Sequence, residues 1–343
     1  MKRMLNMLYV TTQGTYLARK GDTVLVRVEK KTRLRVPIHT LSHVVCFGQV
    51  ACSPALMHLC GENDVAISFL SRNGRFLARV QGPISGNVLL RRQQYRLSDD
   101  EVFTAKIAQL FIAAKIANSR TVLVRAARES ANDKSNTLLT NAAGRLTHVL
   151  NDLSAATDLD EARGHEGDAA RIYFGVFDHL IVAQKEDFSF TKRSRRPPLD
   201  KMNALLSFLY AILANDVRAG IETVGLDPSV GYLHRDRPGR FGLALDLMEE
   251  LRPYLADRLV LSLVNRKQIQ PSGFLQTESG AVNMDDDTRK TVLVTLQKRK
   301  QEEIEHPFLG EKVALGMIPH VQAMLLARHI RGELDTYPPF FWR

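Results

Sequence analysis

Cysteine is scarce in this sequence, and its spacing carries no metal or disulfide signature. The 343 residues include three cysteines, Cys46, Cys52 and Cys60, an odd number with no pair two residues apart. This argues against a disulfide framework and against a cysteine zinc site. We expect buried free thiols in a reducing cytoplasm.

Long apolar runs are also missing. No stretch approaches the roughly 20 apolar residues that span a bilayer. The first ten residues superficially resemble a signal peptide, but their apolar run is short and broken by Asn6, and no small-residue cleavage site precedes Thr11. We predict a first strand there and a cytoplasmic protein.

Several catalytic signatures are absent as well. There is no G-x-G-x-x-G after a strand, no phosphate-binding Walker loop, no G-x-S-x-G and no H-E-x-x-H. What the chain does have is positive charge, with 47 Lys and Arg against 37 Asp and Glu. A polyanionic partner is indicated, nucleic acid first and an acidic membrane second. A solvated basic surface without a partner remains open.

The first 80 residues or so have the pattern of a β domain. Alternating apolar residues at 24–28 and further apolar runs at 33–38, 44–47, 65–70 and 76–80 predict strands. Ser53 before Pro54 predicts a helix start, and Asn73-Gly74 predicts a hairpin.

The remaining sequence is mostly helical in pattern. The predicted helices cover 102–116, 138–153, 166–184, 201–218, 243–258, 286–304 and 311–331, with loops at 185–200 and 266–284. The fold class is therefore α+β. We expect a small antiparallel β domain at 1–83, followed by a larger all-α catalytic domain at 84–343.

Acidic residues and one histidine are candidates for a catalytic site. Glu166 falls on the apolar stripe of its predicted helix, where a carboxylate needs a partner, a proton or a metal. The alternative is an acid at a helix start, favoured by the helix dipole. His234 follows the turn signal Asp227-Pro228 and could be a ligand or a surface residue.

A second acidic group has helical spacing. Asp246, Glu249 and Glu250 share one face of a predicted helix, and their mutual repulsion would be relieved by a divalent cation. They could equally be the solvated side of an amphipathic helix.

Basic residues gather in the loop between two predicted helices. Lys192, Arg193, Arg195 and Arg196 form a run suited to phosphate contacts, and Arg237 adds charge after His234. The alternative is a solvated charge run.

Together these motifs resemble the CRISPR spacer-acquisition integrase family. They occur in family order: E-G-x-x-A-R from Glu166, R-P-P-x-D-x-x-N-A-L-L-S-F from Arg196, D-P-x-x-G-x-L-H from Asp227 and L-A-L-D-L-M-E-E-L-R-P from Leu243. The resemblance extends over the whole chain, and the Tyr337-Pro-Pro-Phe ending is similar to subtype I-C.

The resemblance implies a metal site and a reaction. Its ligands would be Glu166, His234 and Glu249, with Asp246 as a further catalytic residue and Mg²⁺ or Mn²⁺ as the cofactor. The third ligand is often Asp in the family, and Glu249 has one methylene more. A DNA 3′-hydroxyl would attack a phosphodiester at the CRISPR repeat boundary, which requires no nucleotide energy source.

The resemblance also implies partners: a homodimer, with the β domain as its dimer surface, a small ferredoxin-like adaptation protein, prespacer DNA and the CRISPR repeat. Two other functions fit the same residues. One is a metal-dependent, structure-selective DNA repair nuclease. The other is a non-catalytic nucleic-acid scaffold, against which an acid on an apolar face counts.

Overall fold

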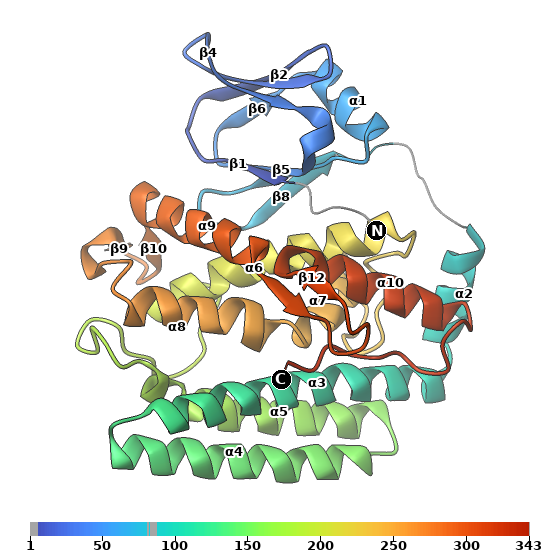
Figure 1. Ribbon diagram of the computed structural model, residues 1–343, viewed down its shortest axis with the longest axis vertical. Coiled ribbons are helices and arrows are strands. Elements are labelled where there is room, and N and C mark those ends of the chain that lie inside the picture. The colour runs from blue at the N-terminus through green and yellow to red at the C-terminus, as the bar shows by residue number, and fades with distance from the viewer. Residues whose placement is uncertain (1–5, 81, 83–87, 343) are drawn as a thin grey trace. The chain divides into compact units, whose positions relative to one another are not determined.

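The chain forms two compact units in the computed structural model, which describes residues 6–80, 82 and 88–342 (Figure 1). The first unit comprises Met1–Ser85 with Met284–Glu302, and the second comprises Gly86–Asn283 with Glu303–Arg343. The prediction divided the chain once, at residue 83, and therefore assigned residues 284–302 to the helical domain. In the structure these residues group with the first unit. The Gly82–Gly86 boundary signal, apart from Gly82, lies outside the described residues.

The first unit contains two four-stranded sheets, in the orders β1-β5-β7-β8 and β4-β3-β2-β6. Their apolar faces and helix α1 (Pro54–Glu62) supply a common core. The strands are β1 (Asn6–Val10), β2 (Thr15–Lys20), β3 (Thr23–Val28), β4 (Lys31–Pro37), β5 (Leu41–Phe47), β6 (Val50–Cys52), β7 (Ala66–Leu70) and β8 (Phe76–Val80).

The prediction of an antiparallel β domain is wrong for part of these sheets. Strand β5 pairs in parallel with both β1 and β7, and β2 pairs in parallel with β6. The chain leaves one sheet for the other and returns, so strands distant in sequence become neighbours. Hydrophobic alternation reports which face of a strand is buried and carries no information about the direction of its partner.

Local signals in this unit are confirmed. The Ser53 side chain accepts a hydrogen bond from the Leu56 N–H at the start of α1. Strands β7 and β8 form the antiparallel hairpin predicted from Asn73-Gly74, and Gly74 has a φ of +83°, which suits glycine. Helix α9 (Asp286–Gln301) also belongs to this unit.

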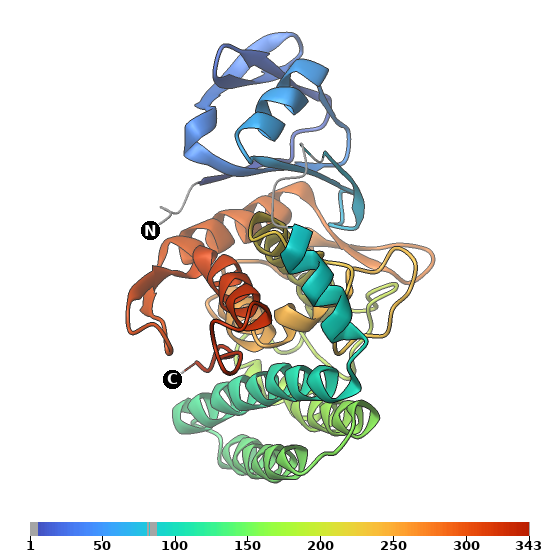
Figure 2. The ribbon, with the colours of Figure 1, turned by 90° about the vertical axis from the view of Figure 1, so that its right-hand side faces the viewer.

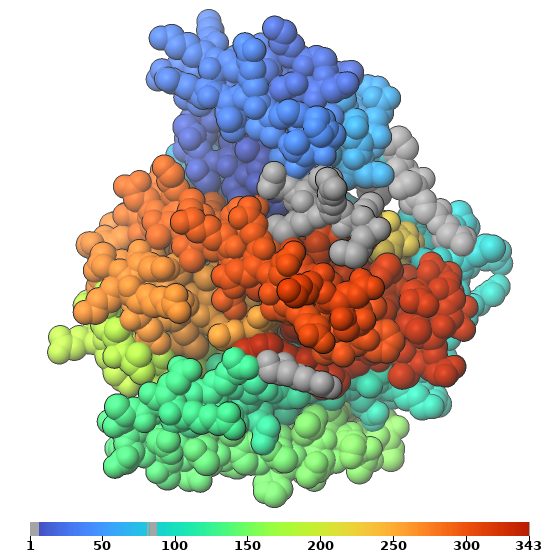
Figure 3. All heavy atoms as spheres, viewed as in Figure 1, coloured from blue at the N-terminus to red at the C-terminus, as the bar shows by residue number. Residues whose placement is uncertain are grey.

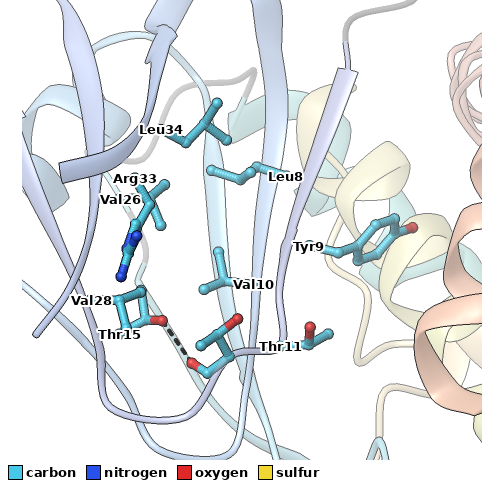
Figure 4. A pocket seen from close by; sticks show the side chains of 10 residues that line it. Leu8, Tyr9, Val10, Thr11, Thr15, Val26, Val28, Arg33 and Leu34 are labelled. Carbon is cyan, nitrogen blue, oxygen red and sulfur yellow. Dashed lines mark hydrogen bonds between the residues drawn. The ribbon is translucent and has the colours of Figure 1, made fainter. Parts of the chain in front are cut away.

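A cavity of about 380 Å³ lies in the first unit beside β1 and β3 (Figure 4). Apolar side chains line most of it, together with Arg33 and threonines, and the Thr15 hydroxyl donates to the Thr12 carbonyl 2.6 Å away. None of the side chains predicted to act in catalysis lines this cavity.

The second unit is mainly helical. Helices α3, α4 and α5 pack against one another on one side of it (Figures 1 and 2), and the side chains of α3 and α4 form a continuous surface in Figure 3. Its helices are α2 (Val88–Ser98), α3 (Glu101–Glu129), α4 (Asp133–Ser154), α5 (Leu159–Gly175), α6 (Lys201–Thr223), α7 (Gly242–Glu249), α8 (Arg258–Asn265) and α10 (Ile318–Ile330).

Several predicted helix boundaries are corrected by capping residues. Helix α5 starts seven residues before Glu166, because the Asp158 side chain caps it by accepting from the Glu161 N–H. Helix α10 starts at Ile318 with Pro319 in its first turn, so the predicted start at 311 is too early. The predicted helix 243–258 is divided into α7, a π-helical turn over Arg252–Asp257 and the start of α8.

The prediction that the second part of the chain is all-α is also wrong. Two short hairpins occur, β9 (Phe274–Gln276) with β10 (Val282–Met284) and β11 (Glu303–Glu305) with β12 (Lys312–Ala314). Each strand has three residues, too few for alternation to be visible in sequence.

Two helices, α3 and α6, are long and apolar enough to cross a membrane by length and composition. Their most apolar windows are 56% and 72% buried inside the protein. This burial is that of core helices, and it explains their apolar character without a bilayer.

Candidate active site

Glu166 lies in the middle of α5, where it meets a lysine of α3. Its carboxylate Oε1 forms an ion pair and accepts a hydrogen bond from Lys115 Nζ. Because α5 begins at Leu159, Glu166 is two turns inside the helix, and the helix-start explanation for this acid is wrong. Ala169 and Tyr173, which share its stripe, are buried.

Glu249, near the end of α7, approaches the same lysine from the other side. Its Oε2 lies 2.7 Å from Lys115 Nζ and its Oε1 lies 2.7 Å from Arg252 Nη1. Burial acts to raise the pKa of Glu249, but Arg252, Lys115 and His234 outweigh it and lower the pKa to about 2. Glu249 is therefore an ionised carboxylate inside the protein.

Lys115 is held charged by these two acids. Burial acts to lower its pKa, whereas Glu249 and Glu166 act in the opposite direction and the pKa is raised. One buried ammonium group thus links two of the three predicted metal ligands.

His234, the third predicted ligand, is fixed by Asp246. His234 Nδ1 lies 2.6 Å from Asp246 Oδ1, and the same oxygen accepts from the His234 N–H. Asp246 Oδ2 accepts from the N–H groups of Tyr232 and Leu233. The imidazole therefore directs its other nitrogen, Nε2, toward Glu249 Oε1, 4.0 Å away.

The loop before His234 requires glycine for this arrangement. A Cβ atom on Gly231 would lie 2.5 Å from Asp246 Oδ2 and 2.7 Å from the Gly242 carbonyl carbon. Buried Gln94 of α2 fastens the same loop, since its amide donates to the carbonyls of Asp227 and Val230. The D-P-x-x-G-x-L-H motif is thus built to present one imidazole nitrogen.

The two acids of α7 and Glu250, which directly follows that helix, are not the solvated face of an amphipathic helix. Asp246, Glu249 and Glu250 are 0%, 3% and 0% exposed. Glu250 points away from Lys115 and accepts hydrogen bonds from the Tyr337 hydroxyl and the Phe340 N–H, so it anchors the C-terminal segment. The three acids, which were predicted to share one helical face, therefore have different contacts: Asp246 holds His234, Glu249 pairs with Lys115 and Glu250 holds the C-terminal segment.

The donor set fits a divalent cation in its chemistry. It offers two carboxylates and one oriented imidazole nitrogen, and Glu249 Oε2 is buried without a hydrogen bond of good geometry. In the part of the chain that the structure describes, no three His, Cys, Asp or Glu side chains converge tightly enough to hold a metal as they stand. The ammonium group of Lys115 stands between the two carboxylates.

A buried network supports the site from behind. Arg252 lies over the Tyr210 ring at 5.0 Å while it contacts Glu249. The Tyr210 hydroxyl donates to Asp257 Oδ1 at 2.6 Å, and the Tyr173 hydroxyl donates to Oδ2 at 3.1 Å. This chain of contacts fixes Arg252, and through it Glu249.

The predicted basic run divides into two kinds of residue. Lys192, Arg195 and Arg196 are exposed, whereas Arg193 is half-buried and donates to Asn203 Oδ1 and Ser207 Oγ. The guanidinium of Arg193 is partly removed from solvent, and this burial lowers the pKa of Arg193.

Arginines from two separate segments act electrostatically on Arg240, which follows His234 in the chain. Burial lowers the pKa of Arg240, and the positive charges of Arg237, Arg195 and Arg196 lower it further. Arg237, Arg195 and Arg196 therefore each lie within electrostatic range of Arg240. Sequence proximity alone did not imply that positive charge from the 185–200 loop acts on Arg240.

Sequence reasoning missed Lys115, Arg252, Tyr210 and Asp257. A signal existed for Lys115, because it is the one charge in the apolar helical run 107–117. Tyr210 and Asp257 have no comparable signal, since each is an ordinary residue of a helical pattern until the fold joins them.

Comparisons with known proteins agree with this architecture. The family model described as "CRISPR associated protein Cas1" matches residues 8–298. A CRISPR-associated endonuclease Cas1 from Chlorobaculum tepidum is 52% identical over 343 residues, covering 100% of both chains.

Solved structures share the fold. A casposase bound to its integration product superimposes with a TM-score of 0.82 at 21% identity, over 97% of this chain and 92% of that one. A Cas6-RT-Cas1–Cas2 complex gives 0.83 at 23% identity, over 99% of this chain and 36% of that one.

Proposed function

This chain belongs to the Cas1 family of CRISPR-associated proteins, and from that premise we propose that it is a metal-dependent DNA endonuclease and integrase. It would insert new spacer DNA into a CRISPR array. The observation that carries the proposal is that Lys115 pairs with both Glu166 and Glu249, while His234 Nε2 lies 4.0 Å from Glu249 Oε1, so that side chains of three separate segments come together at Glu249.

The side chains would divide the work as follows. Glu166 and Glu249 would supply carboxylate oxygens and His234 its Nε2 to Mg²⁺ or Mn²⁺. When bound, that cation would stabilise the charge that develops on phosphate oxygens. Asp246 would position His234 and would not itself bind metal, because backbone and imidazole donors occupy both of its oxygens.

The reaction would exchange one phosphodiester for another. The 3′-hydroxyl of an incoming DNA fragment attacks a phosphorus at the repeat boundary, a new P–O bond forms and the old P–O bond breaks. The displaced oxygen becomes a new 3′-hydroxyl, so no nucleotide energy source is consumed. With water as the nucleophile, the same site would cleave DNA.

The partners follow from family membership and charge. We propose a cytoplasmic homodimer of subtype I-C that binds prespacer DNA and the CRISPR repeat, together with a small ferredoxin-like adaptation protein. The exposed side chains of Lys192, Arg195, Arg196 and Arg237 would contact phosphates. A Cas1–Cas2 assembly among the solved structures of the same fold is compatible with such a partner.

The test is strand transfer into a repeat-bearing plasmid with Mg²⁺ or Mn²⁺. Glu166→Ala, His234→Ala and Glu249→Ala should each abolish insertion, a loss well beyond about tenfold, or about 1.4 kcal/mol. Asp168→Ala is the matched control, because Asp168 is an exposed acid on the same helix as Glu166. Full activity in any ligand variant at saturating Mn²⁺ would remove that residue from the ligand set.

Fragments with blocked 3′ ends distinguish the competing functions. An integrase cannot insert them, although cleavage by water continues. Identical products from blocked and free ends would favour the repair nuclease. DNA binding with neither product would favour a scaffold, a reading against which the buried acids Asp246 and Glu249 already count.

A further inference from the structure

Lys115 occupies an unusual position for a lysine. It lies on the apolar helix α3, where its neighbours Ala114 and Ile116 are fully buried, and its own side chain is 12% exposed. In the described part of the chain, its ammonium group contacts only the carboxylates of Glu166 and Glu249. A buried lysine is costly unless it is paired, so these two contacts explain its retention in the folded protein.

Lys115 contacts carboxylate oxygens that a bound metal would need as ligands. Glu166 Oε1 and Glu249 Oε2 both face the ammonium group, and Glu249 Oε1 faces Arg252. An ammonium group and a divalent cation repel each other and cannot share one site between the same oxygens.

Arg252 and Lys115 differ in how easily their side chains could move away from Glu249. Arg252 is held over the ring of Tyr210 at 5.0 Å, and it uses the Glu249 oxygen that Lys115 does not. Lys115 has a flexible four-carbon stem, so its head can move while its backbone stays in α3.

We propose that Lys115 is a displaceable internal cation, which holds Glu166 and Glu249 together in the metal-free protein and is expelled when the divalent metal binds. This rests on the proposed function, because it takes those two acids as ligands. Without such a cation, the two carboxylates would repel each other and the site would open before metal arrived. The lysine keeps the site assembled and, in exchange, competes with the metal.

The first test measures Mn²⁺ binding by isothermal titration calorimetry. Lys115→Met keeps the length and apolar stem of the side chain but removes the charge. We expect Mn²⁺ to bind about tenfold more tightly or better, because it no longer displaces an ion pair. The metal-free variant should melt at a lower temperature than the wild type, and Mn²⁺ should raise its melting temperature more.

Lys106→Met is the matched control. Lys106 is an exposed lysine on the same helix, so removing it changes the net charge equally without touching the site. Unchanged Mn²⁺ affinity in Lys115→Met, or an equal gain in Lys106→Met, would overturn the proposal.

The second test uses the wild-type protein and does not depend on the folding of a variant. An amine-acylating reagent, read by peptide mass spectrometry, should modify Lys115 several-fold faster with Mn²⁺ than without, while Lys106 reacts at a constant rate. Equal labelling of Lys115 in both conditions would contradict expulsion.

The two proposals fail in different ways. If wild-type protein shows no Mn²⁺ binding that His234→Ala removes, the metal site itself is wrong. If that binding is present but Lys115→Met leaves it unchanged, the metal site stands and the role of Lys115 falls.

Discussion

Asp246 shows how much one buried carboxylate can organise. It accepts three backbone N–H groups and faces the Nδ1 atom of His234, which uses the hydrogen-bonding capacity of both oxygens. It thereby fixes the loop, the ring orientation and the tautomer of His234. Partners of this kind commonly matter almost as much as the ligands they orient.

Replacing Asp246 by Asn should weaken metal binding. An amide nitrogen cannot accept a hydrogen bond, so backbone donors or His234 Nδ1 would face another donor. We expect Mn²⁺ affinity to fall roughly 10- to 100-fold, measured by calorimetry. Asp236→Asn, an exposed acid in the same loop, should leave affinity unchanged. Wild-type affinity in Asp246→Asn would show that the loop holds His234 without this carboxylate.

Glu250 should make stability depend on pH near neutrality. Burial raises its pKa from 4.5 to about 7, although hydrogen bonds from Tyr337, Phe340 and Gln322 act in the opposite direction. The folded state therefore holds a proton that the unfolded state releases. Stability from this group is fully present below about pH 4.5 and is lost as pH rises through about 7, by roughly 3 kcal/mol.

Urea denaturation across that range would measure the effect. Glu250→Gln removes the titrating group and should flatten the decline, while Asp257, whose burial raises its pKa to about 6, continues to contribute. Glu249 acts in the opposite sense, because its pKa is lowered to about 2 and its contribution is lost in acid. A decline of the same size in Glu250→Gln would assign it to another group.

At the scale of elements, the loop 185–200 combines an anchoring arginine with exposed basic residues. Arg193 fastens the loop to α6 through Asn203 and Ser207, and its guanidinium lies 5.2 Å from the Tyr210 ring. The neighbouring basic residues face solvent. One charge run therefore contains both a structural arginine and candidate phosphate contacts.

Single substitutions in this loop should separate the two roles. Arg193→Gln should lower the free energy of unfolding by about 1–3 kcal/mol, since it leaves buried polar partners unsatisfied. Arg195→Gln should weaken DNA binding and leave stability within about 0.5 kcal/mol. Thermal melts and fluorescence anisotropy would measure these effects. Equal stability losses in the two variants would contradict the division.

The end of helix α7 and the residue that follows it serve two purposes. Glu249 faces Lys115, and the next residue, Glu250, anchors the C-terminal segment through Tyr337 and Phe340. Asn118 of α3 donates to the carbonyls of both Glu250 and Phe340. The position of the proposed metal ligand thus depends on a segment about 90 residues away in the sequence.

At the scale of the whole molecule, the net charge of +10 predicts salt-sensitive DNA binding. Each phosphate contact releases condensed counterions, so affinity should fall steeply as salt rises. Neutralising Lys192, Arg195, Arg196 and Arg237 together should weaken binding similarly for unrelated sequences and reduce the salt slope by roughly one per lost contact. An affinity that stays constant from low to moderate salt would contradict the electrostatic account.

The choice between cleavage and insertion should depend on a partner. Water reaches the site unaided, whereas a DNA 3′-hydroxyl must be held in line, and holding it can supply several kcal/mol. We expect this 38.5 kDa chain alone to cleave DNA weakly and without much specificity. Adding the small adaptation protein should make site-specific insertion the major product. Labelled fragments and a repeat-bearing plasmid would show this, and specific insertion without the partner would contradict it.

Local chemistry in the sequence determined much of this protein. The Ser53 cap, the Asn73-Gly74 turn, the change from strand to helix pattern and the family motifs are readable because they depend on neighbours a few residues apart. The candidate ligands Glu166, His234 and Glu249 were implied by the family resemblance that those motifs carry.

Only the tertiary structure decided what depends on distant contacts. The parallel pairing of β5, the grouping of α9 with the first unit and the effect of Arg195 on the pKa of Arg240 follow from contacts between distant segments that no short window of sequence records. The same holds for the burial of Asp246, since a polar residue becomes a positioning group only when folding supplies its donors. Lys115 shows this most clearly. Its charge is visible in the sequence, but the two carboxylates with which it forms ion pairs lie 51 and 134 residues away along the chain.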